Sequence, residues 1–444
     1  MSKCCTYQQH HRRIRPLPLW LVEAQRRIGY ISPMQSTPSL STKPQLSMVQ
    51  LLLCGAAIVT LSMGIRHGFG LWLQPITMER NWSRETFAFA LAVQNLTWGV
   101  AGVFAGMAAD RFGAFRVVVV GAVFYALGLV GMAYAQSPTV FMLAAGVLIG
   151  VAQAGTTYAV VYGVLGRNVP AERRSWAMGI TAAAGSFGQF LMVPTEGFLI
   201  SHFGWQQALT LLGLAALLMM PLAWGLREPS VGGATPAQRE QTILQAVAEA
   251  FKYPSFQLLM AGYFVCGFQV VFIGVHMPSY LKDKGLSPQV ASYALALIGL
   301  FNVFGTYAAG ALGQRLAKRK ILAFIYLARA LAISVFLLVP LSPWSVYVFA
   351  SVMGLLWLST VPPTNATVAQ IFGVAHLSML SGFVFFSHQL GSFLGVWLGG
   401  FLYDRTGSYD VVWGIAIALG VFAALVNLPI QERAIARPAP ASAG

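Results

Sequence analysis

The chain has 444 residues, of which 57% are hydrophobic and only 9% are charged, and its mean hydropathy is +0.67. Soluble domains carry about 25% charged residues, so this composition excludes a soluble globular protein. The formal net charge of +15 does not indicate nucleic-acid binding, because basic residues collect in the cytoplasmic segments of membrane proteins. We therefore expect an all-α, polytopic protein of the lipid bilayer.

Residues 1–47 are basic and polar and contain five prolines. They include no apolar stretch long enough for a signal peptide. We expect a disordered, basic cytoplasmic tail, and Met34 and Met48 are left open as alternative starts to Met1.

Apolar stretches separated by short polar turns recur along the rest of the chain, and each is long enough for a membrane-spanning helix of about 20 residues. Twelve spans are predicted, at 49–78, 85–109, 115–135, 138–166, 175–200, 206–225, 255–280, 289–313, 320–340, 343–370, 377–403 and 410–430. The longest internal loop, 226–254, divides them into an N-terminal half (48–225) and a C-terminal half (255–430). This loop starts as a Pro/Gly linker and continues as an amphipathic helix on the inner membrane face. Residues 431–444 are a predicted cytoplasmic C-terminal tail.

Lys and Arg residues are divided unevenly between the two sides of these spans. Twenty-one lie in the tails and loops on the side of the N-terminus, and five lie in the loops on the other side. Basic residues remain on the cytoplasmic side of a membrane, so both termini are predicted to be cytoplasmic.

The second and fifth spans of each half end in a similar pattern, a small residue followed four positions later by a polar one. The pairs are Gly106 and Asp110, Gly197 and Ser201, Gly310 and Gln314, and Gly400 and Asp404. Spans 2 and 5 run in opposite directions, so each half is predicted to consist of two inverted three-helix units. This arrangement is typical of secondary transporters.

Residues 106–116, GMAADRFGAFR, resemble the signature G-x-L-A-D-R-x-G-R-K-x between helices 2 and 3 of the major facilitator superfamily. The matching residues are Gly106, Ala109, Asp110, Arg111 and Gly113, with Ala114 and Phe115 in place of the basic pair and Arg116 one position later. The resemblance covers about 48–430 and implies twelve helices in two six-helix halves, with helices 1, 4, 7 and 10 around a central cavity. It also implies a conformational latch, in which Gly106 packs closely on helix 11 and Asp110 caps a helix N-terminus in the other half. The predicted latch residues are Gly106, Asp110, Arg111, Gly113 and Arg116.

Three further segments are similar to bacterial monocarboxylate-porter-like and oxalate/formate-antiporter-like members of this superfamily. They are RHGFGLWLQPI, NWSRETFAFA and HQLGSFLGVWLGGFLYDRTGSY. The resemblance implies a bacterial-type inner (plasma) membrane and a small organic anion as substrate. Many members of that branch pair the substrate carboxylate with an arginine in helix 8, where this chain offers only Asn302. The G-x3-G-P antiporter signature of helix 5 is absent as well, so symport and exchange both remain open.

Ionisable groups at bilayer depth are energetically costly and therefore indicate function. Arg66 is expected to bind the substrate anion, because its planar guanidinium can form two parallel hydrogen bonds to a carboxylate. The alternative is a structural arginine bonded to helix carbonyls. His67 lies about 100° around the helix from Arg66 and is expected to be a core histidine. His388 is expected either to be hydrogen-bonded in the core or to bind the anion or exchange protons.

The other ionisable candidates lie nearer to the ends of their spans. Glu196 is expected to be a partly solvated acid, with proton transport as the alternative. Arg329 is expected to extend from a peripheral helix to the inner membrane face and is left out of the site. His276 shares a helix face with Gln269, and an interfacial or gating role competes there with substrate binding.

The remaining candidates are polar or aromatic. Tyr158 and Tyr162 form a stripe in the fourth span, and the tenth span is interrupted by two prolines before Asn365, which frees backbone carbonyls. Four further polar residues at depth are explained by hydrogen bonds between helices: Gln94, Asn95, Gln153 and Gln189. The predicted substrate-binding residues are Arg66, His388, Tyr158, Tyr162, Gln269, His276, Asn302 and Asn365.

We therefore expect a secondary active transporter that moves a small organic anion, by resemblance a monocarboxylate, through alternating access and driven by co-transported protons or by exchange. The alternatives are a proton-driven multidrug efflux antiporter and, from another class, a membrane sensor or enzyme. Metal-ligand motifs and serine–histidine nucleophile constellations are absent from the sequence. No enzymatic activity, metal or cofactor is expected, and the protein is expected to be a monomer.

Overall fold

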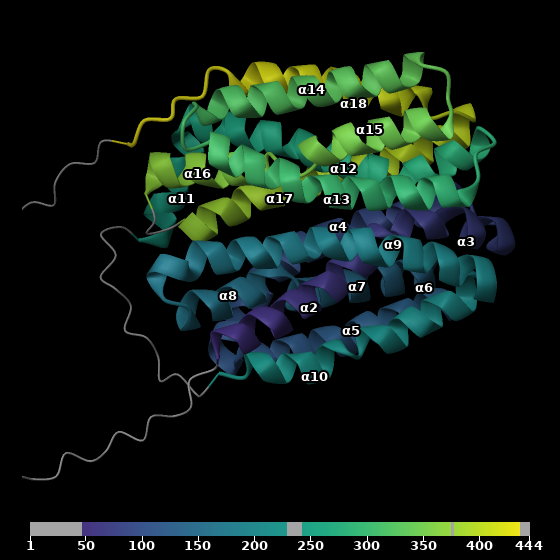
Figure 1. Cartoon of the computed structure of the whole chain (residues 1–444), viewed down its shortest axis with the longest axis horizontal. Helices are drawn as coiled ribbons and strands as arrows, with labels where there is room; N and C mark the ends of the chain where they lie inside the picture. The colour runs from purple at the N-terminus through teal and green to yellow at the C-terminus, as the bar shows by residue number, and fades with distance from the viewer. Residues whose placement is uncertain (1–46, 229–241, 374–376, 436–444) are drawn as a thin grey trace, which may run out of the picture. The chain divides into compact units, whose positions relative to one another are not determined.

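A computed structural model describes residues 47–228, 242–373 and 377–435. The predicted N-terminal tail therefore lies almost wholly outside the described residues, as do parts of the 226–254 loop and of the 431–444 tail. Every regular element in the described ranges is a helix. In Figure 1, α2 to α10 lie together as one group and α11 to α18 as another; they are called the first and second groups below.

The first group contains the first six predicted spans. Its elements are α2 (Met48–His67), η1 (Phe69–Trp72), α3 (Leu73–Arg80), α4 (Arg84–Phe112), α5 (Ala114–Tyr134), α6 (Pro138–Phe141), η2 (Met142–Leu148), α7 (Ile149–Thr156), α8 (Tyr158–Asn168), α9 (Ala171–Ala216), α10 (Met219–Ala223) and η3 (Trp224–Leu226). The first span is thus interrupted at Gly68, and the fourth at Thr157, where φ is −113° and ψ is −159°. Both interruptions free backbone groups in the middle of the membrane-spanning part.

Helix α9 contains two of the predicted spans. Gly204 within it has φ 76° and ψ 161°, a left-handed conformation that glycine adopts without steric penalty. The chain turns at this residue. Eleven helical runs among the described residues are long and apolar enough to cross a membrane, and division of the longest run at Gly204 gives the twelve spans that the sequence predicts.

The second group contains the remaining spans and one amphipathic helix. Its elements are α11 (Ile243–Lys252), α12 (Pro254–Asp283), α13 (Pro288–Leu312), α14 (Lys318–Leu338), α15 (Pro343–Leu356), α16 (Val361–Phe372), α17 (Leu377–Thr406) and α18 (Asp410–Asn427). The helix predicted in the 226–254 loop is present as α11, which starts with a capping box between Thr242 and Gln245. The tenth span is broken between α15 and α16, where Pro362 and Pro363 cannot donate backbone hydrogen bonds.

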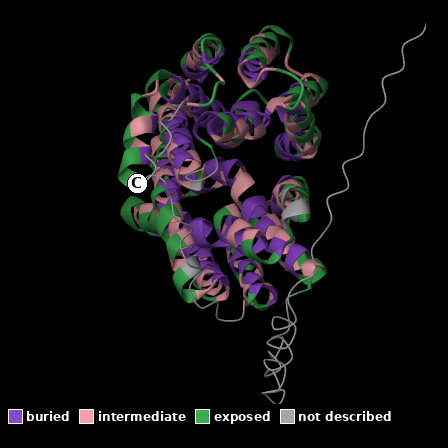
Figure 2. Cartoon of the chain, turned by 90° about the vertical axis from the view of Figure 1, so that its left-hand side faces the viewer, coloured by how far each residue is buried: buried purple, intermediate pink, exposed green. Residues whose placement is uncertain are grey.

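The helices bury their inward faces and expose apolar side chains on the outside. Figure 2 shows buried residues in the interior of each group and exposed residues around the periphery. The exposed side chains include many large apolar ones, among them Phe104, Leu214, Phe324 and Leu425. An apolar exterior is expected of helices that face lipid, because the bilayer core offers no water to polar groups.

The two groups meet through α4 with α17 and through α9 with α13. The contacts between the two groups are polar at the end of the molecule that carries Arg84, which is called the Arg84 end below. The Arg84 guanidinium donates to both carboxylate oxygens of Asp283 on α12, at 2.6 and 2.7 Å. The backbone N–H groups of Arg84 and Glu85 donate to the Asp404 carboxylate on α17, at 3.2 and 2.7 Å. The Arg84 end is therefore closed by an ion pair and by a capped helix N-terminus.

The opposite end of α4, called the Gly106 end below, is different. A Cβ atom added to Gly102 or Gly106 would have no atom of the described residues within 4 Å. The close packing of Gly106 that the resemblance implied is therefore not present in this conformation. Helix α4 ends at Gly113, which has φ 87°, and Arg111 and Arg116 are exposed. The side chain of Asp110 lies outside the described residues.

Candidate functional site

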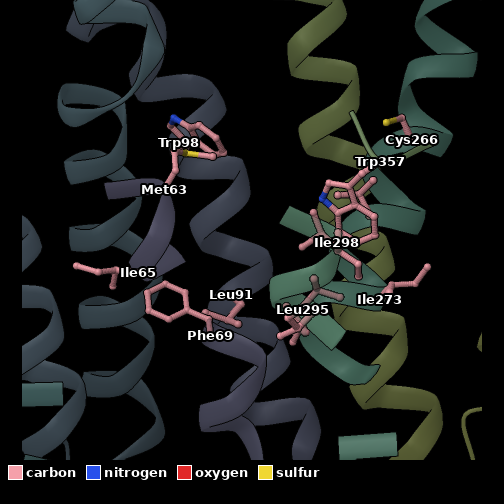
Figure 3. Close-up of a cluster of buried hydrophobic side chains, with 14 of the residues drawn as sticks. Met63, Ile65, Phe69, Leu91, Trp98, Cys266, Ile273, Leu295, Ile298 and Trp357 are labelled. Atoms are coloured by element: carbon pink, nitrogen blue, oxygen red, sulfur yellow. The ribbon is translucent and has the colours of Figure 1, made fainter. Parts of the chain in front are cut away.

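A cavity lies between the two groups, near the middle of the membrane-spanning part. Figure 3 shows apolar side chains of this region, with Met63, Phe69, Leu91 and Trp98 from the first group and Leu295, Ile298 and Trp357 from the second. The residues that line the cavity are Arg66, His67, Gly70, Leu91, Gln94, Asn95, Gln189, Val270, Val271, Gly274, Val275 and Trp357. Both groups therefore contribute to it, the first group most of the polar atoms and the second mainly aliphatic ones.

Arg66 brings a positive charge to this cavity. It lies in the last turn of α2 and is half-buried. Its Nη2 donates to Asn95 Oδ1 at 2.6 Å, and its guanidinium carbon lies 4.8 Å from the centre of the Trp98 ring. Its Nε is buried without a hydrogen-bond partner. The cavity lining contains no acidic residue, so Arg66 faces the cavity as a cation without a carboxylate.

Asn95 holds Arg66 in place and is itself fixed from several directions. Its Nδ2 donates to the Leu91 carbonyl at 2.8 Å. The backbone carbonyl of Asn95 accepts a hydrogen bond from Gln389 Nε2 of α17 at 3.1 Å. The arginine is therefore tied, through the side chain and the backbone of Asn95, to both groups of helices.

His67 also lines the cavity, although it was left out of the predicted site, and the hydrogen bond expected of a core histidine is present. Its Nδ1 lies 2.6 Å from the Met63 carbonyl. Helix α2 ends at His67, and the chain turns through Gly68 into η1, so Arg66 and His67 both border the cavity at the end of the helix.

Two glutamines complete the polar part of the lining. Gln94 donates from Nε2 to the Ala145 carbonyl at 2.7 Å, and Gln189 donates to the Leu295 carbonyl across the two groups at 2.8 Å. The interhelical hydrogen bonds predicted for these residues are present. The Gln189 Oε1 atom is nevertheless buried without a hydrogen-bond partner, so it is a free acceptor beside the cavity.

Two predicted binding residues of α12 are committed to structural hydrogen bonds inside the second group. His276 is 0% exposed, and its Nε2 lies 2.8 Å from the Val396 carbonyl. Gln269 donates to the Ala416 carbonyl at 2.8 Å. Neither residue belongs to the cavity lining, because both lie on the side of α12 that faces α17 and α18.

Other predicted residues lie near the cavity but outside its lining. The rings of Tyr158 and Tyr162 lie tilted against each other, with centroids 5.5 Å apart, and Tyr158 lies close enough to Arg66 for an electrostatic interaction. His388 is buried, with its Nδ1 atom 3.1 Å from Gln389 Oε1. Gln389 in turn bonds Asn95, so His388 is two hydrogen-bond steps from Arg66's partner. A role for these three residues in substrate binding stays a prediction.

Asn302 and Asn365 have different surroundings. Asn302 donates to Ser186 Oγ on α9 at 2.9 Å and accepts from the Leu358 N–H at 2.9 Å. It therefore joins α13, α9 and the break between α15 and α16. Asn365 is exposed and donates to the Val361 carbonyl within its own helix, at 3.2 Å. Neither lines the cavity.

Arg329 does not extend to the membrane surface, so the sequence-based expectation was wrong. It is 0% exposed, and its guanidinium donates to the Leu356 carbonyl at 2.7 Å and to the Trp357 carbonyl. These carbonyls are free because the helix breaks after Leu356. Since Trp357 lines the cavity, Arg329 fixes the segment that presents this indole. The signal in the sequence was the proline pair that interrupts the tenth span, because an interrupted helix leaves backbone carbonyls that need a buried hydrogen-bond donor.

Glu196 is likewise fully buried, with 0% exposure, and the expectation of a partly solvated acid was wrong. Its Oε2 accepts a hydrogen bond from the Trp72 indole at 3.0 Å. No signal local to Glu196 predicts this, because the covering residues lie on the first span, 124 positions earlier.

In sequence, the chain is similar to a family of transporters and to individual transport proteins. The family model described as Major Facilitator Superfamily matches residues 52–372 and 259–443. The MFS-type transporter YcxA of Bacillus subtilis (strain 168) is 25% identical over 411 residues, which cover 88% of this chain and 96% of that protein. Monocarboxylate transporter 11 of Mus musculus is 27% identical over 363 residues, 80% of each chain.

Two solved structures share the fold. A bacterial homolog of the human lysosomal transporter Spinster, in an inward-facing and occupied conformation, has a TM-score of 0.71 and 17% identity, covering 90% of this chain and 100% of that chain. A D-xylose-proton symporter has a TM-score of 0.67 and 16% identity, covering 87% and 99%. The family match covers most of the chain, and the relatives are transporters and not enzymes. This multi-pass membrane protein is therefore a transporter that belongs to the Major Facilitator Superfamily.

Proposed function

We propose that the protein is a secondary active transporter that moves a small organic anion, a monocarboxylate, together with a proton. The observation that carries this proposal is Arg66, a cation that faces the central cavity and has no carboxylate partner there. A permanent charge at this depth is costly unless it is balanced, and a substrate anion would balance it.

The surroundings of Arg66 match the two parts of a monocarboxylate. Its guanidinium has donors beyond the one that Asn95 occupies, and a carboxylate can accept two of them in parallel. The second group contributes a largely aliphatic wall from α12, made of Val270, Val271 and Val275. A short apolar chain would lie against this wall while its carboxylate meets Arg66.

The relatives support the same substrate class. Monocarboxylate transporters 11, 12 and 13 of several vertebrates are 23–27% identical to this chain over more than half of its length. The acidic groups that a cationic drug requires are missing from the cavity lining. This favours an anion carrier over the multidrug efflux alternative, and over a sensor or enzyme.

We further propose that the Gly106 end faces the cytoplasm, as the distribution of Lys and Arg indicates, in a bacterial-type inner membrane. The contacts at the Arg84 end then close the outer side, and the conformation is inward-facing. Substrate would pass as the two groups rock about the cavity. The predicted latch, from Gly106 to Arg116, would engage in the opposite conformation.

Uptake of labelled lactate into proteoliposomes that contain the purified protein tests the site. Arg66→Gln should abolish uptake, whereas the matched control Arg80→Gln should retain it. Like Arg66, Arg80 donates to a side-chain amide oxygen and lies over an indole ring, but at the Arg84 end. Its partners are Gln136 Oε1 at 3.0 Å and the Trp205 ring at 5.4 Å. Normal uptake by folded Arg66→Gln protein would refute the site.

A further inference from the structure

Glu196 is an acid buried in the membrane-spanning part that the anion site does not use. It lies on α9 and is 0% exposed. Its Oε2 accepts one hydrogen bond, from Trp72 Nε1 at 3.0 Å. Its Oε1 is buried and has no hydrogen-bond partner within the described part of the chain. A carboxyl group with a single neutral donor in the interior requires a physical explanation.

Among the residues that the structure describes, no basic side chain forms an ion pair with this carboxyl group. The ion pairs found in the described ranges use other acids: Asp283, Glu228 and Glu432. Transfer of an unpaired carboxylate into a protein interior is so unfavourable that the group takes up a proton instead. In this conformation Glu196 is therefore a neutral carboxylic acid.

The titratable groups on neighbouring elements do not change this conclusion. On α5, the Tyr125 hydroxyl lies close enough to interact electrostatically with Glu196, but it donates its hydrogen bond to the Ser62 carbonyl at 2.9 Å. On α2, Arg66 is bonded to Asn95 and His67 to the Met63 carbonyl. On α13, the neutral Ser292 hydroxyl faces α9 and bonds the Val193 carbonyl.

Glu196 is connected to the anion site through the broken first span. Residues 66–72 contribute Arg66, His67 and Gly70 to the cavity lining, and the same segment supplies the Trp72 donor. Gly68 lies directly against the carboxyl group, since a Cβ atom there would overlap Glu196 Oε2. A change in the charge of Glu196 would therefore act on the turn that carries Arg66.

We propose that Glu196 is the site that binds the transported proton. This inference rests on the proposed function and adds the coupling residue to it. When the Arg84 end opens, the Glu196 carboxylate takes a proton from hydronium, which gives the carboxylic acid and water. The neutral acid can then be buried against Trp72 and Gly68 as that end closes. When water enters the cavity at Gly70 from the Gly106 side, the acid returns its proton to water, and the carboxylate re-forms.

Glu196→Gln tests the proposal, because glutamine keeps the volume and an oxygen acceptor for Trp72 but cannot titrate. Labelled lactate is supplied to proteoliposomes in two assays: uptake driven by an imposed proton gradient, and exchange against unlabelled lactate at equal pH on both sides. We expect Glu196→Gln to reduce gradient-driven uptake by about tenfold, as is typical of coupling between sites, while exchange continues.

The control is Glu79→Gln. Glu79 Oε2 accepts from the Trp205 indole at 2.5 Å, the same pair of groups, but Glu79 is exposed. This variant should retain both activities. Trp72→Phe supplies a second test, since loss of the one donor that the described residues offer to the carboxyl group should shift the pH dependence of gradient-driven uptake while exchange continues.

The outcomes separate this inference from the proposed function. Wild-type protein that exchanges lactate but shows no gradient-driven uptake would refute proton coupling altogether, and absence of both would refute the proposed substrate class. Wild-type coupling that persists in Glu196→Gln, or a pH profile unchanged by Trp72→Phe, would overturn the assignment of Glu196 alone.

Discussion

The ion pair between Arg84 and Asp283 should determine how often the Arg84 end is open. Asp283→Asn keeps the shape of the side chain and an oxygen acceptor for Gln74, whose Nε2 donates to Asp283 Oδ1 at 2.7 Å. It removes the charge that holds the Arg84 guanidinium. Because this contact joins α4 to α12, it is made only while the two groups are closed at this end.

The size of the effect follows from the geometry. Arg84 donates to both oxygens of Asp283, and the two side chains are 13% and 27% exposed, so solvent screens the pair only in part. Hydrogen bonds between charged groups contribute about 1.5–3 kcal/mol, and exposed ion pairs less than about 1 kcal/mol. A loss of about 1–2 kcal/mol shifts an equilibrium by about five- to thirtyfold. Asp283→Asn should increase the population open at the Arg84 end by that factor.

Spin labels report this population directly. Both Met78 on α3 and Lys284 beyond α12 are exposed, so cysteines at these positions, with the native cysteines replaced by serine, allow electron–electron distance measurement across the Arg84 end. Asp283→Asn should transfer population from the short to the long distance. Glu228→Gln is the matched control, because its ion pair with Arg167 lies within the first group. A distance distribution unchanged by Asp283→Asn would refute the reasoning.

Two further predictions concern stability. Arg329→Gln should lower the thermal unfolding temperature of the purified protein by several degrees. The reason is that the carbonyls of Leu356 and Trp357 lose their donor, and each buried carbonyl without a donor costs about 1–3 kcal/mol. Unfolding at the wild-type temperature would show that Arg329 does not hold the helix break. Gly68→Ala should destabilise by about 1–3 kcal/mol through overpacking against the Glu196 carboxyl group, and Glu196→Ala in the same chain should recover part of the loss. Equal stability of Gly68→Ala and wild type would contradict the close contact.

The fold was predictable because the apolar stretches of the sequence coincide with the helices that are long enough to span a membrane. Each predicted span contains the apolar core of a helix or of a broken helix, and the errors lie at the ends. Helix α4, for instance, extends from Arg84 to Phe112 where 85–109 was predicted, because charged residues belong to the first and last turns of a helix that reaches water. The turn at Gly204 was found from the polar residues around it.

The site was predictable only in part. Arg66 was identified because a charge at bilayer depth stands out in any sequence. His67 was left out of the site because it lies about 100° around the helix from Arg66, and Arg329 was left out because its helix was expected to be peripheral. A long side chain can reach from such a helix to the carbonyls left free where α15 ends at Leu356. Hydropathy and spacing carry no information on contacts of that kind.

The charged turn at the Gly106 end has a counterpart at the Arg84 end, around Asp404. Asp404 follows Gly400 by four residues and precedes the left-handed Gly407, as Asp110 follows Gly106 and precedes the left-handed Gly113. A Cβ atom on Gly400 would lie 2.7 Å from Ala88 Cβ of α4.

This close approach lets the Asp404 carboxylate accept the first N–H groups of α4, which have no partner within their own helix. A negative charge is also favoured at that end of the helix dipole. One copy of the pattern is thus engaged here, whereas Gly106 of the other copy has open space around it. Because the two copies lie at opposite ends of the same pair of helices, rocking that separates Asp404 from α4 would bring the turn at Asp110 toward the start of α17. The contact at Asp404 is the pattern on which the predicted latch at the Gly106 end is based, and the latch itself stays a prediction.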